Sequence, residues 1–419
     1  MDHFNYRDGV LHAEDVPLPE ITAAVGTPVY VYSRATLTRH ARVFRDALSV
    51  LPAAKIAFAV KSNPNLAVLK VLAAEGYGAD VVSGGEMERA LAAGMAADNV
   101  VFSGVGKTEA EMRRALAAGI GQFNLESEEE GVELAEVARS MGLTASAALR
   151  VNPDVDAGTH GKISTGKAEN KFGVPFDRAA GIYARLAATP GLSMRGLAVH
   201  IGSQLSKLEP LEAAFEKVGG LMRDIRSAGH SVTHMDLGGG VGVPYKAGDT
   251  FPSPAEYAAM VARVTADWNV TLMFEPGRVI TGNTGVLITQ VVRVKEGAVH
   301  PWVVVDAAMN DLARPALYDA WHDFAAVTPS GLTFTANIVG PICESSDTFA
   351  MAREIDKVEK GDFAVFRTAG AYGATMANTY NSRPLVPEVM VDGSRWAVVA
   401  ERIDPAAILA AEQVPEWLA

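Results

Sequence analysis

The chain has 419 residues and a formal net charge of −12, with 49% hydrophobic and 21% charged residues. This is the composition of a globular protein, and it excludes a disordered or fibrous chain. The acidic balance disfavours a nucleic-acid binder, because such a protein needs a basic surface to meet the phosphate backbone. The length is sufficient for two or three domains.

The single cysteine, Cys343, excludes an internal disulfide and a thiolate zinc site. It is either a small buried side chain or a functional thiol. The amino-terminal residues lack the apolar core of a secretory signal, and no run of about 18 apolar residues occurs. We therefore expect a cytoplasmic protein that has no membrane partner.

The predicted elements begin with a strand-like run, TPVYVYS, at residues 27–33. Eight further apolar runs follow between Lys55 and Arg278. Their continuous apolar character predicts strands that are buried on both faces, as in a parallel sheet. The runs are KIAFAV from Lys55, GADVVS from Gly78, NVVFSG from Asn99, GQFNLES from Gly121, AALRVN from Ala147, RGLAVHIG from Arg195, HMDLGG from His234 and LMFEPG from Leu272.

The segments between these runs have helical spacing. Thr108 with Glu111 three residues later predicts a capping box at the start of a helix. A second helix, over residues 127–142, has three acids in its first turn, where the helix dipole favours them. Further helices are expected at residues 64–76, from Pro64 to Gly76, and at residues 208–229 and 253–268.

Eight strands alternating with helices over about 220 residues predict a (β/α)8 barrel, with a doubly wound open sheet as the alternative. After Arg278, strand-like runs dominate. We therefore expect an α/β barrel at residues 37–280. Residues 1–36 and 281–419 would form a β-rich domain, a sandwich or a small barrel, which includes the run at 27–33.

Active-site groups of a parallel barrel lie at the carboxyl ends of its strands. Lys61 follows the first predicted strand, where it is either an ion-paired surface lysine or a desolvated amine suited to Schiff-base chemistry. His200 and Ser203 follow the sixth strand, although a lone histidine is more often structural. The long Gly-rich connection at residues 154–173 is of a length that is usually functional or mobile.

Gly238 to Gly240 follow the seventh strand and can present backbone amides to a phosphate, although glycines also serve tight turns. Glu275, Gly277 and Arg278 follow the eighth, where a structural ion pair is the alternative. A pyridoxal phosphate site typically combines the groups that these residues place on one rim: an amine, an imidazole, a glycine loop, a carboxylate and a guanidinium. No CxxC, HExxH or GxxxxGK[ST] occurs, so no metal is expected.

Nine motifs of the chain resemble those of the diaminopimelate decarboxylase family. That family belongs to the fold-type III group of pyridoxal-phosphate enzymes, with the alanine-racemase barrel. The resemblance extends from Gly26 to Gly393 and so covers nearly the whole chain. The motifs are AVKSN, LRVNPDVD, STGKAENKFG, HIGSQ, DLGGGVG, EPGR, GPICESSD, AGAYG and YNSRP.

The resemblance implies a role for each matching residue. Lys61 would carry the cofactor as an imine, His200 would stack on its ring, and Glu275 would bond the pyridine nitrogen. Cys343 would protonate the carbanion, and Glu344 would bind the reacting or distal end of the substrate. Further cofactor residues would be Ser203, Gly238, Gly239, Gly240, Pro276, Gly277, Arg278 and Tyr372. The substrate residues would be Arg278, Arg314, Tyr318 and Tyr372, together with Glu344.

The expected reaction is the decarboxylation of meso-2,6-diaminopimelate to L-lysine and CO₂, the last step of lysine biosynthesis. Glu275 favours a decarboxylase over a racemase, because a carboxylate keeps the pyridine nitrogen protonated and makes the ring a strong electron sink. In this family the CES segment comes from the second subunit, so the resemblance implies a homodimer with a shared active site. Ser346 stands where many members have glycine.

Two alternatives to this function are open. One is a related decarboxylase that acts on ornithine, arginine, carboxynorspermidine or a D-amino acid. Arg278 and Arg314 argue against it, because a substrate without a second carboxylate would leave buried arginines unpaired. The other is a non-catalytic homologue that binds pyridoxal phosphate, which the presence of Lys61 and Cys343 disfavours.

Overall fold

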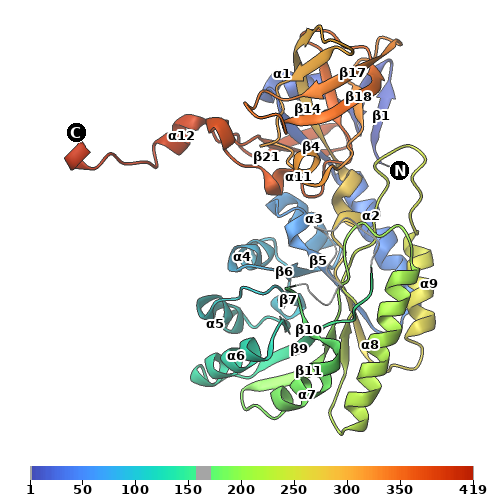
Figure 1. Cartoon of the computed structure of the whole chain (residues 1–419), viewed down its shortest axis with the longest axis vertical. Helices are drawn as coiled ribbons and strands as arrows, with labels where there is room; N and C mark the ends of the chain where they lie inside the picture. Colours follow the sequence, from blue (N-terminus) through green and yellow to red (C-terminus); the bar gives the residue numbers. More distant parts are fainter. Residues whose placement is uncertain (1, 157–170, 419) are drawn as a thin grey trace. The chain divides into compact units, whose positions relative to one another are not determined.

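The computed structural model describes residues 2–156 and 171–418. The chain divides into two compact units (Figure 1). The unit that we call the barrel unit comprises Thr38–Pro244 and Thr250–Ile280. The unit that we call the β unit comprises Met1–Leu37, Tyr245–Asp249 and Thr281–Ala419. Most of the long connection predicted at residues 154–173 lies outside the described residues.

Within the described ranges of the barrel unit, eight parallel strands form a closed sheet. Their order is β9–β11–β12–β13–β5–β6–β7–β8, and β8 pairs with β9 to complete the ring. This closure confirms the predicted barrel and excludes the open doubly wound sheet. The strands are β5 (Ala54–Ala59), β6 (Gly78–Val81), β7 (Val100–Phe102), β8 (Gln122–Leu125), β9 (Ala145–Asn152), β11 (Leu192–Ala198), β12 (His234–Asp236) and β13 (Thr271–Phe274); the short β10 (Val174–Pro175) also pairs with β9.

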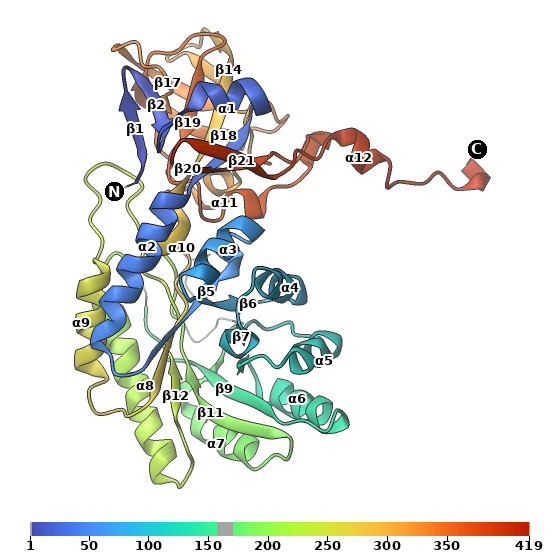
Figure 2. The same ribbon diagram turned by 180° about the vertical axis from the view of Figure 1, so that it is seen from behind.

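Helices cover the outer face of the barrel strands (Figure 2). α5 (Glu109–Ala118) begins with the predicted capping box, in which Thr108 and Glu111 satisfy each other's backbone amides. α3 (Leu66–Ala74) begins later than expected, because the Asn65 side chain, and not Pro64, caps it. The others are α4 (Gly84–Ala92), α6 (Glu128–Ser140), α7 (Phe176–Ala187), α8 (Glu209–Ser227), α9 (Pro254–Val264) and the short α10 (Arg278–Thr281), while α2 (Arg34–Ala47) precedes the first barrel strand.

The β unit contains a mixed sheet in the order β18–β17–β15–β14–β4–β20–β21. The amino-terminal β4 (Val29–Ser33) pairs antiparallel with β14 (Gly285–Lys295) and parallel with β20 (Glu388–Asp392). The prediction that this early run joins the β-rich domain is therefore confirmed. The other strands are β15 (Trp302–Val305), β16 (Phe324–Ala326), β17 (Thr333–Val339), β18 (Thr348–Asp356), β19 (Phe363–Phe366) and β21 (Arg395–Ala400), with the helices α11 (Arg314–Tyr318) and α12 (Pro405–Leu409).

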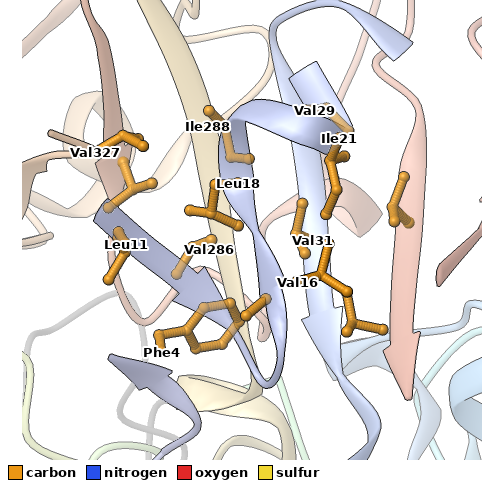
Figure 3. Close-up of a cluster of buried hydrophobic side chains, with 14 residues drawn as sticks. Phe4, Leu11, Val16, Leu18, Ile21, Val29, Val31, Val286, Ile288 and Val327 are labelled. Carbon is orange, nitrogen blue, oxygen red and sulfur yellow. The ribbon is translucent and has the colours of Figure 1, made fainter. Parts of the chain in front are cut away.

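A small antiparallel sheet at the amino terminus packs on this mixed sheet (Figure 3). It contains β1 (Phe4–Arg7), β2 (Val10–Ala13) and β3 (Val16–Pro17), and α1 (Leu18–Val25) follows it. Complete burial of one such apolar side chain contributes about 1.5–3 kcal/mol, so these residues are an integral part of the unit. The cluster includes Phe4, Leu11, Val16, Leu18, Ile21, Val29, Val31, Val286, Ile288 and Val327.

Among the described residues, every helix is too short or too polar to cross a membrane.

Candidate active site

A cavity of about 370 Å³ opens at the carboxyl ends of the barrel strands. Three predicted site residues line it: Lys61, His200 and Glu275. Lys61 lies in the 3-10 turn Val60–Ser62 that follows β5, His200 lies two residues after β11, and Glu275 comes directly after β13. Strands of a parallel barrel end at one rim, and this explains how residues far apart in the sequence meet here.

The amine of Lys61 lies against a buried carboxylate. Its Nζ donates a hydrogen bond to Asp80 Oδ2 at 2.7 Å, and Asp80, in β6, is fully buried. The other carboxylate oxygen, Oδ1, has no hydrogen-bond partner among the described residues. The ion-paired and the functional interpretations of Lys61 are therefore compatible, because Asp80 holds the amine at the cavity.

His200 presents a neutral imidazole to the cavity. Desolvation, with smaller contributions from Arg150 and Lys61, lowers the pKa of His200 well below its ordinary value. The backbone N–H of Gly239 donates to His200 Nδ1 at 3.2 Å, so this nitrogen accepts and carries no proton. A neutral ring is suited to stacking on a flat aromatic group and is a poor acid.

Glu275 lies beside a second carboxyl group, that of Asp236 at the end of β12. The Asn124 side chain links the two, because its Nδ2 donates to Asp236 Oδ2 at 2.8 Å and to Glu275 Oε1 at 3.3 Å. Desolvation is the main cause that raises the pKa of both carboxyl groups, and the charges of Asp236 and Asp80 raise the pKa of Glu275 further.

These charges provide a test of whether pyridoxal phosphate fits the cavity. Asp236 and Glu275 line the cavity, and the buried Asp80 adds a third negative charge that acts on Glu275, whereas Lys61 is the cation whose charge acts on it. Arg150, which also lines the cavity, is paired with Glu126 at 2.8 Å. A protonated pyridine nitrogen at Glu275 would add the positive charge that the acidic cluster lacks. The amine, the neutral imidazole and the acidic cluster therefore fit this cofactor.

The glycine loop after β12 is packed against neighbouring backbone. Gly238 has a φ of +64°, and its carbonyl accepts a hydrogen bond from the Glu275 N–H at 2.7 Å. A Cβ atom on Gly239 would lie 2.2 Å from the Glu275 carbonyl oxygen, and one on Gly240 would lie 2.5 Å from the Gly202 carbonyl oxygen. Glycine is thus required by close backbone approach, and the predicted contact of Gly238, Gly239 and Gly240 with a phosphate stays a prediction.

The structure brings two more of the predicted residues into contact. Arg278, the first residue of α10, is buried, and its Nη2 donates to Ser203 Oγ at 3.2 Å. Pro276 and Gly277 form the link between Glu275 and this helix. A Cβ on Gly277 would lie 3.1 Å from the Cβ of Ala59, so the turn is tight at the first strand of the barrel.

The remaining five candidates belong to the β unit. Arg314 is buried at the start of α11, where its Nη1 lies 2.7 Å from His322 Nε2 and its guanidinium stacks on Tyr245 at 4.7 Å. Tyr318, the last residue of the same helix, is half-buried. Tyr372 has a φ of +55°, a conformation that costs about 1–2 kcal/mol for a residue with a side chain. Strain of this kind often accompanies functional positions.

Cys343 and Glu344 lie on an exposed loop that hydrogen bonds hold in shape. The Cys343 N–H donates to Asn381 Oδ1 at 3.1 Å. Glu344 Oε2 accepts from the Tyr380 hydroxyl at 2.8 Å, and its Oε1 accepts from the Ser346 hydroxyl. The bonds from Ser346 and Tyr380 lower the pKa of Glu344. Position 346 is a serine, where many family members have glycine, and its hydroxyl therefore contacts Glu344, a candidate substrate-binding residue.

Comparisons with known proteins identify the family of the chain. Residues 34–282 match the family described as "Pyridoxal-dependent decarboxylase, pyridoxal binding domain". The diaminopimelate decarboxylase of Zymomonas mobilis is 52% identical over 418 residues, which cover 99% of each chain, and that of Vibrio cholerae is 48% identical over 417 residues, again 99% of each. The solved diaminopimelate decarboxylase of M. jannaschii, in co-complex with L-lysine, has a TM-score of 0.96 at 33% identity, covering 100% of this chain and 99% of that chain.

The chain belongs to the diaminopimelate decarboxylase family. The resemblance found in the motifs is therefore confirmed, as are the lyase class and the pyridoxal phosphate-binding domain. The lysine/ornithine decarboxylase of Vibrio vulnificus, at 22% identity and a TM-score of 0.78, shares the fold with this family member.

Sequence reasoning missed three polar residues in the interior of this decarboxylase barrel. They are Asp80 on β6, Asn124 on β8 and Asp236 on β12, and all are buried. In the sequence, each of them is a polar residue inside or at the end of an apolar run. A buried polar group requires a hydrogen-bond partner, so polar residues at these positions predict a polar network inside the barrel.

Proposed function

We propose that this chain catalyses the pyridoxal phosphate-dependent decarboxylation of meso-2,6-diaminopimelate to L-lysine and CO₂. The observation that carries the proposal is the convergence of Lys61, His200 and Glu275 on one cavity at the barrel rim. Relatives with about half of their residues identical over the full length bear the name of this activity. Membership of the family and the chemistry of the cavity thus support the same reaction.

Bound pyridoxal phosphate supplies an electron sink for the electrons that remain when CO₂ departs. Lys61 would provide the amine that attaches to the cofactor, and Asp80 orients this amine through the bond at Nζ. Glu275 would hold the proton of the ring nitrogen. His200 would support the ring as an uncharged stacking partner, because a cation there would disfavour protonation of the ring nitrogen.

The substrate residues follow from the matching motifs. Arg278 and Arg314 hold the carboxylate that remains on the product, since a guanidinium binds a carboxylate through two parallel bonds. Tyr318 and Tyr372 complete this part of the site. Glu344, kept ionised by two hydroxyl groups, binds the ammonium group at the distal end of the substrate. Cys343 would supply the proton that replaces the lost carboxyl group.

The active site that we propose is shared within a homodimer, with the loop of Cys343 and Glu344 supplied by the second subunit. Diaminopimelate is the small-molecule partner, and no nucleic acid or membrane is involved. The cytoplasmic location expected from the sequence stays a prediction.

The direct test is to measure CO₂ and L-lysine from purified protein that is saturated with pyridoxal phosphate and given meso-diaminopimelate. We expect both products in equal amounts. The Lys61→Ala variant should lose turnover together with the visible absorbance of the bound cofactor. Absence of turnover by the loaded wild-type protein would refute the proposal, and an unchanged spectrum of the variant would refute the assignment of Lys61.

The same assay distinguishes the alternative substrates. Ornithine lacks the second carboxylate, so it would leave Arg278 and Arg314 without their partner. We expect its kcat/KM to be at least about 100-fold below that of diaminopimelate. Equal values for the two substrates would instead favour a decarboxylase of basic amino acids in general.

A further inference from the structure

The proposed function leaves one feature of the cavity unused, the carboxyl group of Asp236 beside that of Glu275. Backbone bonds fix the two strand ends that carry them. The Leu237 N–H donates to the Met273 carbonyl at 2.9 Å, and the Glu275 N–H donates to the Gly238 carbonyl at 2.7 Å. The backbone at the two strand ends therefore holds these residues side by side at the barrel rim.

The hydrogen bonds to the two carboxyl groups are unequal. Asp236 Oδ1 accepts from the Gly238 N–H at 2.9 Å, and Oδ2 accepts from Asn124 Nδ2 at 2.8 Å. Glu275 Oε1 receives longer bonds, from Asn124 at 3.3 Å and from the Ser103 hydroxyl at 3.4 Å. Short bonds from N–H donors stabilise an ionised carboxylate more than long ones do. A single proton shared by the pair is therefore held on Glu275.

The amide of Asn124 is fixed in the orientation that this distribution requires. Gln122 Nε2 donates to Asn124 Oδ1 at 2.8 Å, so the NH₂ end of Asn124 points toward the carboxyl groups. Both residues lie on β8 and are buried in the barrel interior. The hydrogen bond to Asp236 is thus donated by a side chain of β8, a strand that does not adjoin β12.

The charged groups around the pair also favour a retained proton. The charge of Asp80 on β6 raises the pKa of Glu275, and the positive charge of Lys61 lowers it. Arg150 on β9 is paired with Glu126, and His200 after β11 is neutral. With both carboxyl groups ionised, three negative charges would face one ammonium group. Desolvation also raises the pKa of both carboxyl groups, and a raised pKa favours the protonated form.

We propose that Asp236 is a positioning residue that keeps a proton on Glu275, so that Glu275 brings to the cavity the proton that the cofactor's ring nitrogen carries. This inference rests on the proposed role of Glu275. The O–H bond of Glu275 breaks, its electron pair stays on the carboxylate, and an N–H bond forms at the ring nitrogen. Total charge and proton number do not change, so no proton is taken from solvent at this step.

The test is to count the protons taken up when pyridoxal phosphate binds to the apoenzyme. Calorimetry in alkaline buffers of different ionisation enthalpy gives this number, under conditions where the ring nitrogen of the free cofactor is unprotonated. In the Asp236→Asn variant, Glu275 loses its charged neighbour, so a larger fraction of it is ionised in the apoenzyme at the alkaline pH of the assay. We expect the variant to take up more protons per site than the wild type, up to about one. Equal uptake by both proteins would overturn the proposal.

Two controls separate this effect from a general disturbance. The exposed residue Asp224 on α8 provides a matched change, Asp224→Asn, which should leave proton uptake unchanged. In a Glu275→Gln background, adding Asp236→Asn should have no further effect on the proton count, because the carrier is absent. A persistent difference there would show that Asp236 acts through another group, contrary to the proposal.

A second measurement needs no Asp236 variant and decides the question even if that variant does not fold. The infrared spectrum of the wild-type apoenzyme should contain a band from a protonated carboxyl group that is lost on cofactor binding. This band should be missing in Glu275→Gln. If the wild type has no such band, Glu275 is already ionised and the proposal is wrong. Neither readout uses diaminopimelate, so failure of the proposed decarboxylation would be recognised separately by the product assay.

Discussion

The carboxyl group of Glu275 is placed where it destabilises the empty protein. It is only partly exposed, it lies beside Asp236 and Asp80, and its pKa is raised well above the ordinary value, chiefly by desolvation. A carboxyl group of this kind loses its proton more readily in the unfolded chain than in the folded one. The free energy of unfolding therefore falls as the pH rises from about 4.3 toward the folded-state pKa.

The Glu275→Gln variant should accordingly stabilise the apoenzyme while it impairs the reaction. The amide keeps the shape of the side chain and removes the loss of stability at higher pH. We expect a gain of about 1–2 kcal/mol in the free energy of unfolding at pH near 8, and a smaller gain near pH 5. Urea denaturation of the apoenzyme at the two pH values measures it. The exposed Glu133 on α6 supplies the control, Glu133→Gln, and a loss of stability in Glu275→Gln at both pH values would contradict the prediction.

Cys343 offers a change that should affect the reaction and spare the cofactor. The thiol is exposed on its loop, and the contact that the loop makes at this residue, with Asn381, uses the backbone N–H. Cys343→Ala therefore leaves the loop bonds intact. We expect kcat to fall by about 10²–10⁴-fold, the usual contribution of a positioned proton donor, with unchanged affinity for pyridoxal phosphate. Ser345→Ala is the adjacent control, and unchanged kcat in Cys343→Ala would return the residue to a structural role.

At the scale of elements, two helices of the barrel unit carry the same capping box but differ in one contact. Glu256 bonds the backbone and side chain of Ser253 at the start of α9. Glu111 makes the equivalent bonds to Thr108, and its Oε1 also accepts from the Gly84 N–H at 2.8 Å. Gly84 is the first residue of α4, so Glu111 caps one helix and holds the start of its neighbour.

Replacing these two glutamates by alanine should separate the stabilisation from the capping box, which both make, from that of the bond to Gly84, which only Glu111 makes. Glu111→Ala should lower the free energy of unfolding by about 0.5–1.5 kcal/mol more than Glu256→Ala, which is the range for one further hydrogen bond. Hydrogen bonds lower the pKa of both carboxyl groups, so this difference should shrink as the pH falls below about 4.3. Denaturation curves at neutral and acidic pH test the pair, and equal losses would show that the bond to Gly84 contributes nothing.

How far the sequence predicts each element depends on the range of the interactions that form it. The barrel strands were predictable because burial on both faces leaves continuous apolar runs, and α5 was predictable because its cap lies within four residues. The strands β1, β2 and β3 have two to four residues, too few to show a period of two. They form because they pack on β4 and β14, and their own sequence does not reveal that contact.

The same distinction applies to the site. Lys61, His200 and Glu275 were predictable because each directly follows an apolar run, where a parallel barrel places its functional groups. Asn124 was not, because its partner Asp236 is 112 residues away and on a strand that does not adjoin β8. Only closure of the barrel brings these two side chains together, so the sequence alone gives no indication of the partner of Asn124.

At the scale of the whole molecule, the proposed shared site predicts complementation between two inactive variants. Lys61→Ala removes the cofactor amine, and Cys343→Ala removes the proton donor. If one subunit supplies the first and its partner the second, mixed dimers regain one intact site. Unfolding and refolding the two variants together should then restore about a quarter of wild-type activity, the statistical expectation for a two-fold dimer. Each variant refolded alone is the control, and no gain on mixing would show that each site is built within one chain.

The position of β4 has a consequence for how the chain is made. This strand is synthesised before any part of the barrel, yet its two neighbours in the sheet, β14 and β20, come from beyond residue 284. Both edges of β4 therefore stay unpaired on the ribosome while the barrel unit is completed, and exposed strand edges invite wrong pairing. Biogenesis of this enzyme thus depends on protecting its first long strand until the last part of the chain emerges.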